Sequence, residues 1–196
     1  PSGLVDIDLD CNEALLLANY LLPITTAIFG RASKPSSHRL YIAEGGATVR
    51  FKAPDGATLL ELRCAGSQTV CPGSEHPSGE AIKWEKNDEP AQVDPAELRK
   101  AAAKLAAASL LTRCYPQAGG RHAFVLTLAG ALLRSGWSED EAGQFIAAIA
   151  RAAGDEEARA RLTDIKTTAR RLANDGPATG WPTLAGYTDE AGRGLA

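Results

Sequence analysis

Apolar and acidic residues alternate strictly along Val5-Asp6-Ile7-Asp8-Leu9-Asp10. A strand projects successive side chains to opposite faces, so the three carboxylates share one face and the three apolar side chains share the other. Neighbouring like charges repel and Asp is a poor strand former, so a divalent cation over the acidic face would explain the pattern. Oxygen ligands at this spacing suit Mg²⁺ or Mn²⁺. An amphipathic strand with a solvated acidic face is the alternative.

The composition limits the class of protein. The chain has 196 residues, 44% of them hydrophobic, and a net charge of −3. It can therefore bury a substantial core, and it lacks the global basic field that binds nucleic acid through bulk charge, although local basic patches are compatible with it. With no apolar run long enough to span a membrane and no signal peptide, we expect a cytoplasmic protein without a membrane partner.

The cysteines and the first residue lead to two further expectations. No two of the four cysteines form a CxxC pair, so we expect reduced thiols, with Cys64 and Cys71 as strand cysteines packed in the core. A zinc site formed by Cys64, Cys71 and His76 is the weaker alternative. Because the chain starts on Pro1 and a predicted strand follows at once, we expect a fragment that lacks an N-terminal piece.

The chain changes character near residue 90. Short alternating segments rich in Gly, Pro and Thr fill residues 3–85, whereas residues 95–175 are rich in Ala, Leu, Arg and Glu at helical spacing. We therefore predict an α/β module over residues 1–90 and an all-α helical bundle domain over residues 91–196. The polar, proline-containing stretch 86–95 is the predicted linker.

Local signals place the elements of the first module. A strand is predicted over residues 3–9 and a helix over about 12–21, with Asn12 as its N-cap and Pro23 after its end. Further strands are predicted near residues 25–29, 38–43, 47–52, 58–63, 67–71 and 80–85.

Capping signals place the helices of the second module. Asp94 is the predicted N-cap of a helix to about residue 112, and Ser138 with Glu141 forms a capping box. Asp155 is the predicted cap of the last helix, and Trp181 is expected to pack back on the bundle. The predicted helices cover about residues 95–112, 121–135 and 139–153, followed by one that ends before residue 176.

A loop rich in hydrogen-bond donors begins at residue 30 and leads into the strand predicted at 38–43. Its guanidinium, ammonium, hydroxyl and imidazole groups come from Arg31, Lys34, Ser36 and His38. Each phosphoryl oxygen of a polyphosphate accepts several charge-assisted hydrogen bonds, so this loop suits a triphosphate. An ordinary solvated turn is the alternative.

Glu61 is a further acidic candidate, flanked by leucines in a strand pattern. If its face turns toward Asp8 and Asp10, it supplies another carboxylate to the same cations. The alternative is an edge-strand glutamate paired with Arg63 or with solvent.

These three features together resemble the archaeo-eukaryotic primase superfamily, in particular the primase-polymerases of phages, plasmids and mobile elements. The matching motifs are Asp8 with Asp10, then Ser36-Ser37-His38, then Glu61. The similarity extends to Leu22-Pro23-Ile24-Thr25, to the Gly30-Arg31 turn and to a run from Gln68 to Trp84. It covers about residues 3–85. Members of the family normally carry an additional α/β piece before this region.

The resemblance implies an α+β fold, in which an RRM-like catalytic module has a mixed or antiparallel sheet with helices. This module would act as a template-dependent nucleotidyltransferase in a phage or mobile-element replication protein. Asp8, Asp10 and Glu61 would hold two Mg²⁺ or Mn²⁺ ions and form the catalytic set with His38. Asp6 would be an accessory or surface residue. The implied partners are a single-stranded DNA template, nucleoside triphosphates and a helicase domain or subunit. The implied nucleotide-binding residues are Arg31, Lys34, Ser36, His38 and Arg63.

The helical half supplies weaker candidates. Arg121 and His122 open the second predicted helix, and Lys166 and Arg170 share one face of the fourth, so these four are candidates for template contacts. An ordinary helix start and a solvated face are the alternatives. For the whole chain, the main alternative is a non-catalytic single-strand-binding or replication-initiation module, and a metal-dependent nuclease is less favoured.

Overall fold

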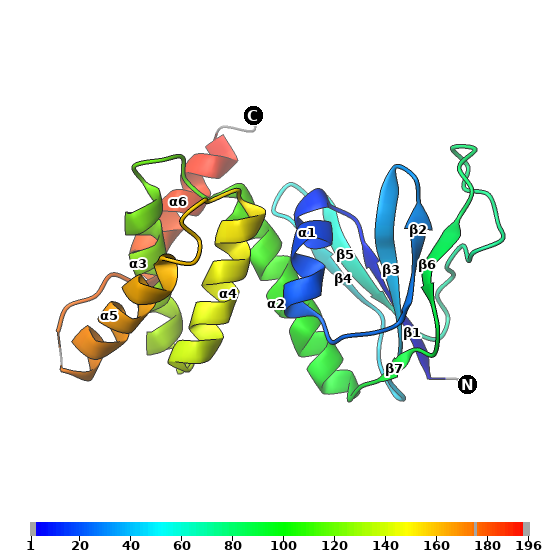
Figure 1. The fold of residues 1–196 in the computed structure, drawn as a ribbon, viewed down its shortest axis with the longest axis horizontal. Helices are drawn as coiled ribbons and strands as arrows, with labels where there is room; N and C mark the ends of the chain where they lie inside the picture. The colour runs from blue at the N-terminus through cyan, green and yellow to red at the C-terminus, as the bar shows by residue number, and fades with distance from the viewer. Residues whose placement is uncertain (1–2, 175, 194–196) are drawn as a thin grey trace. The chain divides into compact units, whose positions relative to one another are not determined.

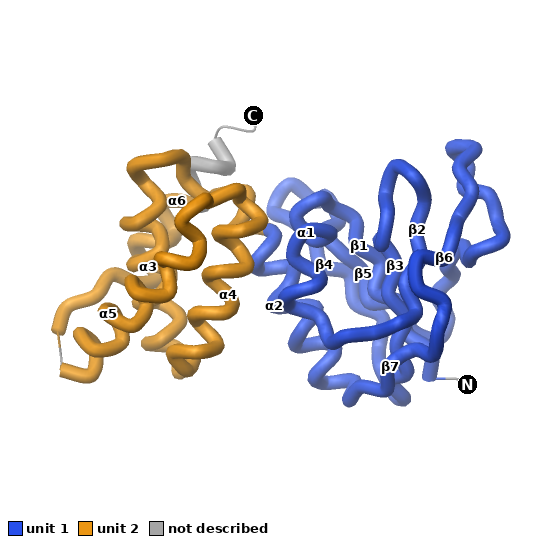
Figure 2. The backbone as a smooth tube through the Cα atoms, viewed as in Figure 1, with its two compact units in different colours: residues 1–109 blue, residues 110–196 orange. Residues whose placement is uncertain are grey.

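The computed structural model describes residues 3–174 and 176–193. The chain divides into two compact units, residues 1–109 and 110–196 (Figure 2). From sequence, the boundary is expected at residue 90, ahead of helix α2 (Pro95–Arg113). The division instead falls inside α2, because most of this helix groups with the residues of the sheet.

The first unit is built on one seven-stranded sheet (Figure 1). The strands run antiparallel in the order β4-β5-β1-β3-β2-β6, and the short β7 pairs parallel with β3. The fold class is therefore α+β with a mainly antiparallel sheet. The elements before α2 are β1 (Leu4–Leu9), α1 (Asn12–Leu21), β2 (Ala27–Arg31), β3 (Lys34–Ile42), β4 (Val49–Lys52), β5 (Thr58–Arg63), β6 (Lys83–Asn87) and β7 (Ala91–Gln92).

Two local predictions in this unit are wrong. Residues 67–71 form no strand, because the segment that contains them is folded by its own turns, with positive φ angles at Gly66 and Gly73. Helix α1 has Cys11 as its N-cap, and no side chain caps it, whereas the sequence favours Asn12.

The alternation in β1 separates the two faces of the sheet as predicted. Val5, Ile7 and Leu9 are fully buried on the face that α1 covers (Figure 1). Tyr41 lies on β3 with its hydroxyl donating to the Pro23 carbonyl after α1 at 2.9 Å. The carboxylates of β1 lie on the other face.

The second unit contains the end of α2 and four further helices, and helices are its regular elements in the described residues. Helix α3 packs against the other three. Whether this unit is a separate accessory domain stays a prediction. The helices are α3 (Arg121–Arg134), α4 (Glu139–Ala152), α5 (Arg161–Ala173) and α6 (Trp181–Arg193).

The capping signals of the second unit are confirmed at one helix and wrong at another. Ser138 and Glu141 form the predicted capping box of α4. Asp155 does not cap α5, which begins at Arg161. Its Oδ1 accepts the Glu157 N–H at 3.0 Å in the turn before that helix, and its Oδ2 accepts from Tyr115 and from Arg161. Trp181 is more exposed than expected, and its indole N–H donates to the Ser135 hydroxyl at 3.0 Å. No helix within residues 3–174 and 176–193 has the length and apolar character needed to cross a membrane.

Candidate active site

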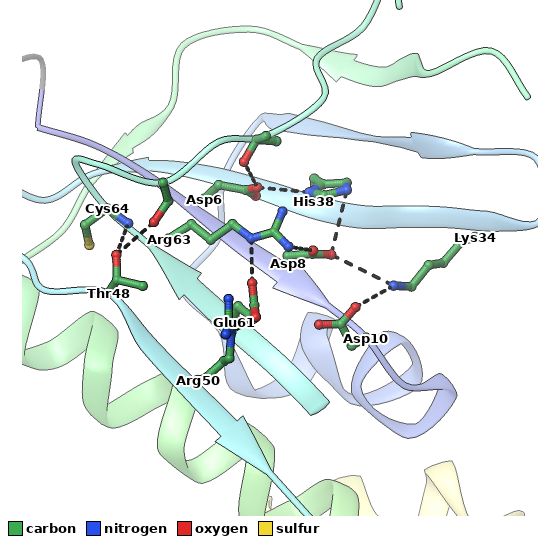
Figure 3. A network of polar contacts seen from close by, with 12 residues as sticks. Asp6, Asp8, Asp10, Lys34, His38, Thr48, Arg50, Glu61, Arg63 and Cys64 are labelled. Carbon is green, nitrogen blue, oxygen red and sulfur yellow. Dashed lines mark hydrogen bonds and ion pairs between the residues drawn. The ribbon is translucent and has the colours of Figure 1, made fainter. Parts of the chain in front are cut away.

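The register of three strands brings the predicted acidic and imidazole residues together. Strand β1 lies between β3 and β5, and Asp8 pairs with His38 on one side and with Glu61 on the other. Residues directly opposite each other on antiparallel strands place their side chains on the same face. The three side chains therefore lie side by side on the face away from α1 (Figure 3).

Asp6 belongs to the same cluster. It is only 4% exposed, so the expectation that it is a surface residue is wrong. Its Oδ2 lies 2.9 Å from His38 Nδ1 and accepts a hydrogen bond from Thr69 Oγ1 at 2.8 Å. The alternation in β1 already placed Asp6 on the acidic face, but only the long-range contacts show that it is enclosed there.

Arg63 joins two of the carboxylates (Figure 3). Its Nη2 lies 2.6 Å from Asp8 Oδ2, and its Nε donates to Glu61 Oε2 at 2.7 Å. Arg50, which the sequence did not single out, pairs with Glu61 across β4 and β5 and donates to its other oxygen. Only the pairing of β4 with β5 identifies Arg50, because nothing in its local sequence does.

These contacts divide the electrostatic roles of the two carboxylates. Burial opposes ionisation of Glu61, but the hydrogen bonds from Arg63 and Arg50 outweigh it, so the pKa of Glu61 is lowered. Burial raises the pKa of Asp8, and attraction to His38 opposes this only in part. Glu61 is thus a stable anion, whereas the charge on Asp8 is costly and attracts further cations.

Lys34 reaches the same cluster from the start of β3. Its Nζ lies 3.1 Å from Asp10 Oδ1 and 3.9 Å from Asp8 Oδ1. The side chain of Asp10 is 28% exposed, so this end of the cluster is the more open one. The structure therefore places Lys34 and Arg63, two predicted nucleotide-binding residues, against the predicted catalytic carboxylates.

The structure does not bring Arg31 and Ser36, the other two predicted nucleotide-binding residues of the β2–β3 hairpin, into contact with the aspartates. Arg31 Nε donates to Glu80 Oε2 at 3.1 Å. Ser36 has a positive φ of 52°, and its backbone N–H and hydroxyl both donate to Glu85. A triphosphate at Arg31 or Ser36 would have to displace these carboxylates.

The family of this chain follows from comparison of its sequence with known proteins. Residues 1–101 match the family described as bifunctional DNA primase/polymerase, N-terminal, or Prim-Pol. The chain belongs to this family. No curated protein and no solved structure matches the chain significantly. The Prim-Pol match covers the whole acidic cluster, and it confirms the predicted family.

Membership gives the Prim-Pol chain a coarse function. The domain suggests a primase/polymerase nucleotidyltransferase role in replication, with a DNA template and nucleotides as implied substrates. Prim-Pol proteins generally depend on divalent metal ions.

The acidic cluster can be tested for its fit to such ions. Within the described residues, no three His, Cys, Asp or Glu side chains are already arranged to hold a metal ion. The alternative zinc site formed by Cys64, Cys71 and His76 is therefore wrong. Two buried carboxylate oxygens, Asp6 Oδ1 and Asp8 Oδ1, nevertheless have no hydrogen-bond partner in the part of the chain that the structure describes. Buried polar atoms are normally satisfied, and carboxylate oxygens are the ligands that Mg²⁺ and Mn²⁺ prefer. The aspartates of the Prim-Pol cluster therefore fit a divalent cation, whereas Glu61 is held by two arginines.

The predicted template contacts in the helical unit have different surroundings. Arg121 Nη1 is paired with Asp155 at 3.2 Å and with Glu156 at 2.8 Å. His122 Nδ1 lies 3.2 Å from an oxygen of Asp164. Arg121 thus has a structural role in the unit. Template binding by these two residues stays a prediction, as it does for the exposed Lys166 and Arg170 of α5.

Proposed function

We propose that this Prim-Pol chain is a template-dependent nucleotidyltransferase, a DNA primase/polymerase that joins nucleotides with two divalent metal ions. It would act in a phage or mobile-element replication protein, together with a helicase domain or subunit. One observation carries the proposal. Asp8 lies between His38 and Glu61 on one face, and among the described residues one buried oxygen each of Asp8 and Asp6 has no hydrogen-bond partner.

The aspartates of β1 would hold the metal ions. Asp6 and Asp8 offer the unpartnered oxygens, and Asp10 adds a third carboxylate at the open end of the cluster. Metal ions bound there would activate the attacking hydroxyl and stabilise the charge at the α-phosphate as pyrophosphate leaves. Glu61 would support the site by holding Arg63 next to Asp8, and it would become a further ligand if Arg50 and Arg63 turned away from it.

The cations of the cluster would bind the triphosphate. Lys34 and Arg63 now neutralise the aspartates, and metal ions would take over that role. The freed ammonium and guanidinium groups match phosphate oxygens in charge and geometry. Catalysis would then rest on positioning and electrostatics, without a covalent enzyme intermediate.

His38 is oriented for the same task. Its Nδ1 is held by Asp6, and its ring stacks on Phe29 with centroids 4.6 Å apart and an interplanar angle of 8°. Its Nε2 lies 3.7 Å from Asp8 Oδ1, beyond hydrogen-bond distance, and is therefore available to a phosphate oxygen.

Replacing the aspartates tests the proposal. We expect Asp8→Ala with Asp10→Ala to abolish primer synthesis and extension with Mg²⁺ or Mn²⁺, while circular dichroism and thermal melting show a folded chain. Asp8→Asn, which keeps the shape of the side chain, should have the same effect. Asp55→Asn removes a charge from an exposed turn of the same unit and should leave synthesis unchanged. Normal extension by the double variant would refute the site.

One observation favours a second function, a non-catalytic single-strand-binding or replication-initiation module. Arg63 contacts both Asp8 and Glu61, where a metal shared by the two carboxylates would lie. Calorimetric titration separates the two functions, because a polymerase should bind a nucleoside triphosphate only with Mn²⁺ or Mg²⁺. A pure binding module should bind single strands without metal and show no metal-dependent nucleotide binding.

A further inference from the structure

The row of paired residues at Asp8 continues across the sheet beyond His38. His38 on β3 pairs with Phe29 on β2, and Phe29 pairs with Trp84 on β6. Because directly opposed residues share a face, Trp84 lies on the same face as the carboxylates, at the far end of one cross-strand row. We call this set of paired residues the aromatic row. It runs from Glu61 through Asp8, His38 and Phe29 to Trp84.

The aromatic row is packed at its centre and open at its end. Phe29 is fully buried and stacks on the His38 ring. Trp84 meets Phe29 edge to face, with centroids 5.2 Å apart and an interplanar angle of 76°. Trp84 is 38% exposed, and every residue of its strand β6 is exposed. The indole is thus fixed by an aromatic neighbour while part of its surface faces solvent.

A cavity of about 400 Å³ lies beside Trp84, lined also by Pro35, Arg31 and Lys83. This volume falls in the range of small-ligand pockets. The positive and negative charges that line the cavity largely cancel, because Arg31 forms an ion pair with Glu80, which also lines it. Lys83 offsets the second acidic lining residue, Glu85, in net charge. The ligand that suits such a cavity is a flat, largely uncharged ring, and aromatic side chains beside basic residues are typical of single-strand binding.

We propose that Trp84 and this cavity form a stacking subsite for an unpaired base of the single-stranded template. The proposal rests on the proposed polymerase function. Trp84 lies three strands away from Asp8, or about 14 Å at about 4.8 Å per strand. An incoming nucleotide whose α-phosphate lies at Asp8 is too short to stack its own base there. A template strand reaches Trp84 within about four base steps of about 3.4 Å each.

The chemistry predicts a sequence-tolerant and weakly salt-dependent contribution. Every base offers a π-face, so the subsite should accept each of them. Salt dependence comes from phosphate neutralisation, and removal of an indole releases no phosphate contact. Loss of Trp84 should therefore lower affinity without changing the slope of log affinity against log salt concentration.

Oligonucleotide binding without metal or nucleotide tests the subsite. We expect Trp84→Ala to weaken binding of a short oligothymidylate about tenfold, at an unchanged salt slope. Trp84→Phe retains a stacking ring and should recover most of the affinity. Leu16→Ala removes an exposed apolar side chain from α1, on the other face of the sheet, and should bind like wild type. Circular dichroism confirms that each variant is folded.

Photo-crosslinking gives a second readout that a merely structural role of Trp84 would not produce. A template carrying 5-bromouracil at successive positions is annealed to a primer and irradiated with the full chain. We expect the Trp84 peptide to crosslink only at unpaired positions a few nucleotides from the primer terminus. Crosslinks elsewhere, or wild-type affinity for Trp84→Ala, or no binding of single strands by the wild-type chain, would overturn the subsite.

The outcomes separate this inference from the proposed function. If Asp8→Asn abolishes synthesis while Trp84→Ala binds single strands normally, the polymerase stands and the subsite fails. If Asp8→Asn still extends primers while Trp84→Ala loses binding, the subsite stands and the catalytic assignment fails.

Discussion

Replacing Asp155 with Asn should destabilise the helical unit by about 2–3 kcal/mol at neutral pH. The Asp155 side chain is 0% exposed. It accepts hydrogen bonds from Tyr115 Oη at 2.6 Å, Arg161 Nε at 3.0 Å and Arg121 Nη1 at 3.2 Å. Burial alone would oppose ionisation, but the hydrogen bonds from Arg161 and Tyr115 outweigh it and lower the pKa of Asp155 from 3.8 to about 2.

The magnitude follows from this lowered pKa. A fall of about two pKa units, at about 1.36 kcal/mol per unit, corresponds to about 2.5 kcal/mol of folding free energy. Because the pKa in the folded state is the lower one, this stability is fully present above pH 3.8 and is lost as the pH falls toward about 2. Asp155→Asn cannot ionise, so it should lack both the stability and this acid dependence. Asp155→Ala should cost about 3–5 kcal/mol, since it removes the buried carboxylate that two enclosed arginines share and leaves them only exposed glutamates.

Urea unfolding at a series of pH values measures both effects. The chain has three tryptophans, so a Trp84→Phe background confines the emission to Trp137 and Trp181, both in the second unit. A change of midpoint at constant slope reports stability. Glu156→Gln is the matched control, because its side chain is 82% exposed although it also pairs with Arg121. Equal effects of the two variants, or an unchanged acid dependence in Asp155→Asn, would refute the reasoning.

Two further substitutions test the sheet unit. In Gly30→Ala, the new Cβ would lie 2.5 Å from the Lys34 carbonyl oxygen and 2.9 Å from the Ser36 nitrogen, so the β2–β3 hairpin must shift. We expect a loss of about 1–3 kcal/mol in thermal unfolding, together with weaker nucleotide binding. Burial raises the pKa of Tyr41 from 10.0 to about 12, so the folded state favours the neutral phenol. The stability that this preference contributes is fully present below pH 10.0 and is lost as the pH rises through about 12. Tyr41→Phe should cost about 1 kcal/mol at neutral pH through the lost hydrogen bond to Pro23, and alkaline denaturation should show a weaker pH dependence.

Elements that depend on local periodicity could be predicted from the sequence. The helix at residues 12–21 and the strand at 58–63 have the predicted bounds, and the capping box at Ser138 is present. The failures occur where distant contacts decide the local structure. Thr69 donates to Asp6 from a segment predicted as a strand. The Asp155 carboxylate accepts from the nearby Glu157 N–H and also from Tyr115, forty residues away.

In the candidate site, too, local sequence predicts some features and distant contacts decide the others. The alternation in β1 places the aspartates on one face, and the sheet pairing brings His38 and Glu61 to either side of Asp8. The sequence could not identify the partners of each charge, because these depend on the strand order. Arg50 reaches Glu61 only because β4 pairs with β5, and Arg31 meets a glutamate 49 residues away.

The charge balance of the cluster links its structure to its chemistry. Four carboxylates face three basic side chains, and two of the aspartates are almost fully buried. The carboxylates are those of Asp6, Asp8, Asp10 and Glu61, and the basic side chains are those of Lys34, Arg50 and Arg63. Like charges at alternate positions of a strand destabilise the sheet unless cations lie close to them. Lys34 and Arg63 meet this need only in part, because Asp8 Oδ1 still lacks a hydrogen bond and burial raises the Asp8 pKa. Metal ions would complete the neutralisation and release the same two side chains toward an anionic triphosphate, so that binding of metal and nucleotide would reinforce each other.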